Sequence, residues 1–148
     1  MRILSLDTGT KTGWATENLS GVEEFAIKRG ESPGMRFLKF RGWLATMLKL
    51  IPELDVIIYE QAHHRGGAAT ACGVGMVTVV LEFAAQHGIE TMSVHSGTLK
   101  KYATGKGNAG KPEMIAEAIR RGYKPVDDNE ADAILMLEYA KEILTGKA

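Results

Sequence analysis

The chain has 148 residues, of which 45% are apolar and 24% are charged, and its 18 basic side chains balance 18 acidic ones. This length and composition predict one globular domain over residues 1–148 and exclude two full domains. The single cysteine, Cys72, excludes an intramolecular disulfide and a zinc or iron–sulfur site built from cysteines, and it favours the reducing cytoplasm.

The first half of the chain has the composition of four strands and one helix. We expect strands at residues 2–7, 13–17 and 22–28. Apolar side chains at helical spacing predict a helix that begins near Ser32 and is ended by Pro52. The apolar run 55–59 is typical of a strand buried on both faces, and Glu60 follows at its carboxyl end, where parallel sheets bind ligands.

The next predicted helix, residues 68–86, consists mostly of small and apolar residues. Its interior glycines, Gly73 and Gly75, each cost about 1 kcal/mol relative to alanine. We therefore expect another element to approach this helix closely, and a second subunit is one such element. The segment is too short to cross about 30 Å of hydrocarbon before Glu82 closes it, so we expect no membrane span. Asp7 interrupts the apolar start of the chain, which argues against a secretory signal.

The remaining residues predict one more strand and three helices. We expect a strand at 90–94, a short helix capped by Ser96, and helices at 112–121 and 127–144. Asp127 and Glu130 have the spacing of a capping box at the last helix. The order β-β-β-α-β-α-β-α-α-α indicates an α/β fold with a mixed sheet of about five strands, the first three antiparallel, flanked by helices on both faces.

Three carboxylates occupy the ends of apolar elements, namely Asp7, Glu60 and Asp132. No Lys or Arg is adjacent in sequence to Asp7 or Glu60, so a divalent cation such as Mg²⁺ or Mn²⁺ is the simplest partner for them. Either Asp128 or Asn129 can share a helical face with Asp132. Such a cluster suits phosphodiester hydrolysis by two metal ions. Taken singly, the three acids are better explained without a metal, as an Asx turn, a surface carboxylate and an exposed helix start. Taken together this explanation weakens, because the first two strands of an α/β sheet are commonly neighbours and a helix running back across them can present an acid to both.

Four short motifs follow one another along the chain. They are Ile3-Leu-Ser-Leu-Asp7-x-Gly9 with Thr12-Gly13-Trp14-Ala15, then Ile58-Tyr-Glu60-Gln61, Thr104-Gly-x-Gly107-x-Ala-x-Lys111 and Glu130-Ala-Asp132-Ala133. In this order and spacing the chain resembles the RuvC-type Holliday-junction resolvases of the RNase H-like superfamily, especially the phage-borne members. The resemblance covers nearly the whole chain. It implies an RNase H-like fold and a metal-dependent endonuclease that nicks branched DNA as a homodimer, in bacteria or in phage-infected cells.

The resemblance also implies roles for individual residues. Asp7, Glu60 and Asp132 correspond to metal ligands, and the family's fourth ligand falls at Asn129, with Asp128 one step earlier. Helix 68–86 corresponds to the helix through which the family dimerises. Contacts with DNA are expected from the residues after the central Glu-Gln and from the basic segments, which are His63, His64, Arg65, Lys100, Lys101, Lys106 and Lys111.

Two other functions remain open on the sequence. A nucleic-acid-binding module of the same fold, either without activity or specific for forks, flaps or RNA, is favoured by Asn129 and by the zero net charge. An actin-like ATPase is suggested by the segment 7–13, which resembles a phosphate loop, but 148 residues provide only one of the two domains that such enzymes need. For each lysine, ordinary solvation is as good an explanation as contact with DNA.

Overall fold

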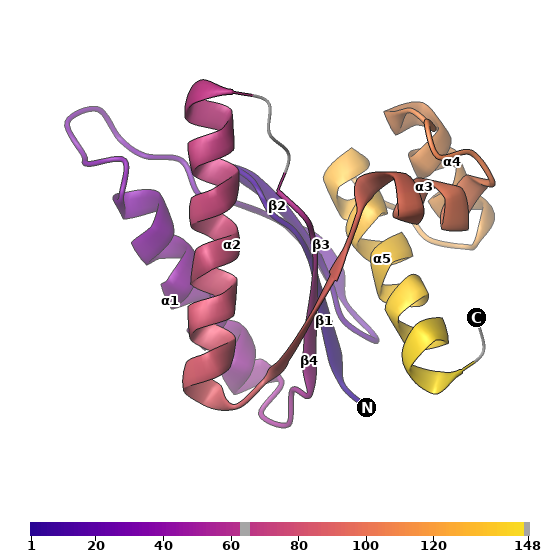
Figure 1. The fold of residues 1–148 in the computed structure, drawn as a ribbon, viewed down its shortest axis with the longest axis horizontal. Coiled ribbons are helices and arrows are strands. Elements are labelled where there is room, and N and C mark those ends of the chain that lie inside the picture. The colour runs from indigo at the N-terminus through magenta and orange to yellow at the C-terminus, as the bar shows by residue number, and fades with distance from the viewer. Residues whose placement is uncertain (63–65, 147–148) are drawn as a thin grey trace.

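The computed structural model describes residues 1–62 and 66–146, which form a five-stranded mixed sheet between two layers of helices (Figure 1). In chain order the elements are β1 (Ile3–Asp7), β2 (Lys11–Ala15), β3 (Ser20–Glu24), α1 (Met35–Leu50), β4 (Val56–Glu60), α2 (Gly67–His87), β5 (Glu90–Val94), α3 (Ser96–Thr104), α4 (Lys111–Arg120) and α5 (Asp128–Thr145). The strand order is β3-β2-β1-β4-β5. Strands β1, β2 and β3 are antiparallel, whereas β4 and β5 run parallel to β1, which confirms the predicted fold class.

Three predicted boundaries are wrong. Strand β2 ends at Ala15, because Ala15 already pairs with Ser20 across a tight hairpin. Strand β3 therefore begins at Ser20, and it ends before Phe25, whose ring turns into the core. Helix α3 is capped by the side chain of His95, which accepts a hydrogen bond from the Gly97 N–H at 3.1 Å, and Ser96 is the first helical residue.

The two faces of the sheet bury different clusters. Strand residues alternate between faces, so Leu4 and Leu6 pack beneath α1 and α2, while Ile3 packs beneath α3, α4 and α5. In β4, Ile57 packs with Leu4 and Leu6 on the face covered by α1 and α2. Its neighbours Val56 and Ile58 pack with Ile3 on the opposite face. Figure 1 shows the corresponding layers, with α1 and α2 on one side of the sheet and the other helices opposite.

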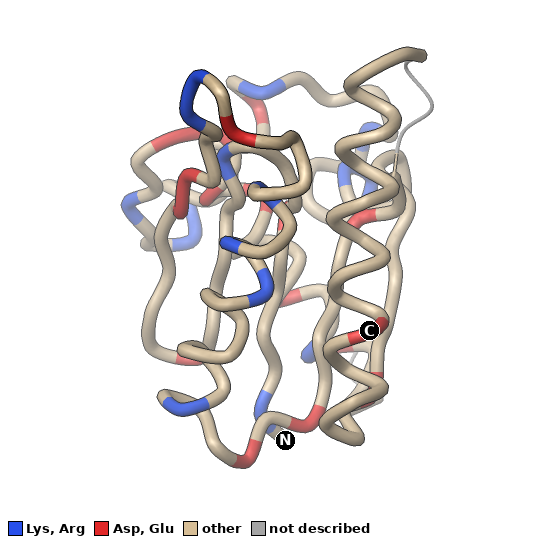
Figure 2. The backbone as a smooth tube through the Cα atoms, turned by 90° about the vertical axis from the view of Figure 1, so that its left-hand side faces the viewer, with Lys and Arg blue, Asp and Glu red and all other residues tan. Residues whose placement is uncertain are grey.

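Helix α2 packs on the sheet through one apolar stripe, which is made of Met76, Val79, Val80, Phe83 and Ala84. A Cβ at Gly75 would lie 2.3 Å from the Phe37 ring, so the element that requires this glycine is α1 of the same chain. Among the described residues α2 is the one helix long and apolar enough to cross a membrane by length and composition, and 28% of its apolar window is buried inside the molecule. Figure 2 shows that α2 contains no Lys or Arg.

Candidate metal centre

Strand geometry brings the first two predicted carboxylates together. Leu6 of β1 is in register with Tyr59 of the parallel strand β4, so the next residues, Asp7 and Glu60, lie side by side where both strands end. Asp7 shares the odd-numbered face of β1 with Ser5, whose hydroxyl donates to the Ala133 carbonyl of α5 at 2.8 Å. Because side chains alternate along a strand, Asp7 points to the same side of the sheet as α5.

The start of α5 lies directly over this edge of the sheet. Asp127 caps the helix by accepting a hydrogen bond from the Glu130 N–H at 2.9 Å, as the sequence predicted. Gly13, the partner of Asp7 on β2, allows the close approach, since a Cβ there would lie 1.9 Å from the Asn129 carbonyl oxygen. Asp132 follows one turn into the helix and is thereby placed beside the two strand carboxylates.

The three carboxylates form one cluster. One oxygen each from Asp7, Glu60 and Asp132 can be chosen so that all lie within 4.8 Å of one another. Asp132 Oδ1 is buried and has no hydrogen-bond partner in the described part of the chain. An oxygen-only donor set with an unsatisfied buried acceptor fits a hard divalent cation such as Mg²⁺ or Mn²⁺.

The electrostatics of the cluster agree with this fit. Burial, followed by the nearby carboxylates of Glu60 and Asp132, raises the pKa of Asp7 well above its usual range. Burial, followed by the carboxylates of Glu60 and Asp128, raises the pKa of Asp132 to about 7, against a smaller opposing effect of Lys100 and Lys111. Carboxyl groups that lie close together resist ionisation, because their negative charges repel one another. A bound cation offsets this repulsion.

The two residues considered for a fourth ligand have different partners. The Asn129 side-chain nitrogen donates to Asp127 Oδ2 at 3.2 Å, so this amide is engaged in the cap of α5. Asp128 faces the carboxylate cluster closely enough to raise the pKa of both Asp7 and Asp132. Its Oδ2 lies 3.7 Å from Lys111 Nζ.

An open cleft of about 510 Å³ contains all five of these acidic and amide residues. Its other polar or reactive lining residues include Thr8, Thr10, Gln61, Cys72, Lys100 and Lys111. The two lysines are thus the members of the predicted basic set that reach the cleft. Lys101 is exposed outside the cleft, and Lys106 lies 3.9 Å from Glu113. The remaining predicted contacts, His63, His64 and Arg65, fall outside the described residues.

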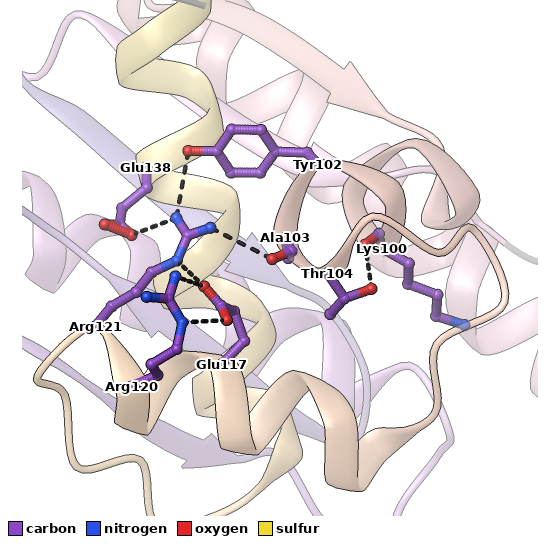
Figure 3. A network of polar contacts seen from close by, with 8 residues as sticks. All are labelled: Lys100, Tyr102, Ala103, Thr104, Glu117, Arg120, Arg121 and Glu138. Atoms are coloured by element: carbon purple, nitrogen blue, oxygen red, sulfur yellow. Dashed lines mark hydrogen bonds and ion pairs between the residues drawn. The ribbon is translucent and has the colours of Figure 1, made fainter.

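A second polar cluster holds the lysine-bearing helices against α5 (Figure 3). Arg121, just after α4, donates to Glu138 of α5 at 3.1 Å and to the Ala103 carbonyl of α3 at 3.4 Å. It also binds Glu117 of α4, and its guanidinium lies 5.4 Å from the centre of the Tyr102 ring. One side chain therefore joins α3, α4 and α5, the helices that present Lys100, Lys111 and Asp132.

Two structural features next to the site were not recognised from sequence. Gly13 was noted as part of a motif, but the close approach that requires it depends on where α5 docks. Glu130 was predicted to complete the capping box, whereas its carboxylate accepts from the Val126 N–H and from Ser20. Thr8 and Gln61 follow directly after Asp7 and Glu60, so proximity in sequence was a usable signal for these two cleft residues.

Comparison with solved structures defines the class of fold. No protein-family model matches the chain, and no curated protein matches its sequence. RuvC of Thermus thermophilus in complex with a Holliday junction substrate superposes with a TM-score of 0.79 and 19% identity, covering 99% of this chain and 96% of that one. Another T. thermophilus RuvC structure gives 0.74 and 17%, covering 99% and 97%. The yeast mitochondrial Holliday junction resolvase gives 0.59 and 14%, covering 99% and 86%. The chain therefore has the RuvC variant of the RNase H-like fold, as its motifs predicted.

Proposed function

We propose that the protein is a metal-dependent endonuclease that nicks branched DNA and resolves four-way junctions. The observation that carries this proposal is the cluster of Asp7, Glu60 and Asp132, which converges in an open cleft beside two lysines. The RuvC fold adds weight, because one structural neighbour is a RuvC bound to a Holliday junction substrate. A cytoplasmic location, in a bacterium or a phage-infected cell, is part of the proposal.

The cleft residues have separate roles in this proposal, since the acids bind metal and the lysines attract phosphate. Asp7, Glu60 and Asp132 would hold Mg²⁺ or Mn²⁺. Asp128 would be the fourth ligand, because it lies close enough to raise the pKa of both Asp7 and Asp132. The bound cations supply an activated water and stabilise charge on the departing oxygen. Lys100 and Lys111 attract the phosphate backbone into the cleft, and Lys101 and Lys106 extend this attraction over the neighbouring surface. His63, His64 and Arg65 are proposed to contact DNA near the branch.

We also propose that two copies associate through α2. Five residues on its outer face are exposed and recur at spacings of three and four, namely Ala71, Val74, Thr78, Leu81 and Ala85. Val74 is 46% exposed and Leu81 is 42% exposed, and this spacing is typical of the seam between paired helices. Association would cover this apolar face. The resulting dimer would carry two clefts, one for each of the two strands that resolution of a junction must cut.

A substrate panel tests the activity. Labelled four-way junction, fork, flap, duplex and single strand are incubated side by side with Mg²⁺, Mn²⁺ or a chelator. We expect metal-dependent nicks that are fastest in the four-way junction. Binding of the junction without cleavage in either metal would favour the inactive binding module. Faster cleavage of forks or flaps than of the four-way junction would support the same chemistry on a different branched substrate.

Light scattering tests the dimer at micromolar concentration. We expect twice the mass of one chain for the wild type and a single-chain mass for Leu81→Glu. Ile119→Glu is the matched control, since Ile119 is 57% exposed on α4, on the opposite side of the sheet. A monomeric wild type, or two variants of equal mass, would contradict association through α2.

A further inference from the structure

Glu130 is a buried carboxylate that the proposed chemistry does not use. Its side chain is 6% exposed, and among the described residues it forms no ion pair. A buried charge without a cation is costly unless its oxygens accept hydrogen bonds. Glu130 Oε1 accepts from the Val126 N–H at 2.8 Å, and Oε2 accepts from the Ser20 hydroxyl at 2.6 Å.

These two bonds connect the start of α5 to a distant part of the chain. Val126 precedes the Asp127 cap, and Ser20 begins β3 at its pairing with Ala15 of β2. Glu130 stands on α5 between Asp128 and Asp132. The Ser20 bond therefore fixes the first turn of the helix to the β2–β3 hairpin, while Gly13 lets the same turn rest on β2.

The orientation of this turn decides where Asp132 points. A side-chain atom about 6 Å from a helix axis moves by roughly 1.5 Å when the helix rotates by about 15°. Metal–oxygen distances tolerate changes of only about 0.2 Å. A small rotation of α5 would therefore separate the Asp132 carboxylate from those of Asp7 and Glu60.

We propose that Glu130 is a positioning residue for the metal centre, acting through its bonds to Ser20 and to the Val126 N–H. It holds the first turn of α5 in the rotation at which Asp132 meets the strand carboxylates. This inference rests on the proposed metal-dependent function and adds a determinant of metal affinity that touches neither the metal nor DNA.

The test measures binding of Mn²⁺ alone to the full chain by calorimetry, with thermal unfolding in chelator as a check of the fold. We expect Glu130→Ala to weaken Mn²⁺ binding about tenfold, as loss of the groups that orient metal ligands commonly does. Ser20→Ala, which removes one bond at an exposed position, should weaken it less. Glu130→Gln should bind nearly as well as the wild type, because its amide can accept from Val126 and donate to Ser20.

Val79→Ala is the control for a general loss of stability, since Val79 belongs to the buried stripe of α2 on the opposite face of the sheet. It should unfold at lower temperature and keep its Mn²⁺ affinity. Unchanged affinity in both Glu130→Ala and Ser20→Ala would overturn the inference, and so would equal losses in Glu130→Gln and Glu130→Ala. If the wild type bound no Mn²⁺, the proposed metal centre would fail and this inference with it. Binding of Mn²⁺ without DNA cleavage would contradict the nuclease alone.

Discussion

Helix α5 contributes to two groups of carboxylates whose pKa values are shifted in opposite directions. At its start, Asp132 joins Asp7 and Glu60, and burial together with the carboxylates of Glu60 and Asp128 raises the pKa of Asp132 to about 7. Two turns later, Glu138 joins Glu117 around Arg121. There, hydrogen bonds from Arg120 and Arg121 lower the pKa of Glu117 to about 2.

The difference separates a candidate metal site from a cluster that stabilises the fold. Paired carboxylates around Arg121 favour the folded state, because their charges are satisfied within the protein. Asp7 and Asp132, whose pKa values are raised, oppose folding when they are ionised without a cation, and this cost is retained where the geometry suits a metal. Substitutions in the two groups should therefore change different properties.

Asp132→Asn should separate activity from stability most clearly. Loss of one metal ligand removes several kcal/mol of transition-state stabilisation, so we expect cleavage to fall at least ~1000-fold. Because the substitution also removes a like charge from the cluster, thermal stability in chelator should be retained or raised. Rates on a four-way junction and unfolding temperatures of the same preparations provide the measurement. Cleavage within tenfold of wild type would contradict the assignment.

Gly13→Ala tests whether the first cluster depends on the close approach of α5. The added Cβ would lie 1.9 Å from the Asn129 carbonyl oxygen, so the helix must move. We expect a loss of about 3 kcal/mol in the free energy of unfolding, together with weaker metal binding. Gly42→Ala on α1 is the matched control, because nothing lies within 4 Å of its Cβ position. Equal stability of the two variants in urea unfolding would contradict this account.

Arg121→Met probes the second cluster while retaining most of the side-chain bulk. Three helices lose a shared donor, and we expect unfolding free energy to fall by about 2 kcal/mol. Arg120→Met should cost less, because Arg120 is 71% exposed and Arg121 is 21% exposed. The affinity for Mn²⁺ should stay within twofold in both variants. Chemical denaturation and calorimetry measure the two quantities, and equal stability losses would refute a special role for Arg121.

The dependence of stability on pH should carry the signatures of both clusters. The pKa of Asp132 is about 7 in the folded state and about 3.9 in an unfolded chain, so the folded protein binds this proton more tightly. Its contribution to stability is complete below pH ~4 and is lost as the pH rises toward 7. The pKa of Glu117 is lowered to about 2, so its contribution is present above pH ~4.3 and is lost as the pH falls toward 2.

Urea unfolding in chelator across this pH range provides the measurement. Asp132→Asn should flatten the decline above pH ~4, and Glu117→Gln should flatten the decline below it. Mg²⁺ should remove the upper decline in the wild type, because a bound cation stabilises the ionised carboxylates. A wild-type stability that rises between pH ~4 and 7 and is unaffected by Asp132→Asn would contradict this interpretation.

The order of elements was predictable from sequence because each element carries a local signal. Mostly apolar residues mark β1, continuous apolar residues mark β4, and Pro52 ends α1 as expected. The convergence of Asp7, Glu60 and Asp132 was also predictable, since carboxyl ends of adjacent parallel strands share one edge of a sheet.

Contacts that depend on docking were not predictable. The partner of Gly75 is Phe37 of the same chain, which no local pattern reveals. The bond between Ser20 and Glu130 and the helices gathered by Arg121 likewise arise only when distant segments meet. The phage-like subtype, the fourth metal ligand and the DNA contacts at residues 63–65 stay predictions.

The hydrogen bond between Ser5 and Ala133 joins residues that are 128 positions apart, and Asp7 and Asp132 lie beside its two ends. The ribosome must therefore synthesise α5 before the carboxylate of Asp132 can reach those of Asp7 and Glu60. During synthesis, the growing chain exposes Asp7 and Glu60 without the third acid. The proposed metal centre can therefore form only after α5 has been synthesised and has docked on the sheet.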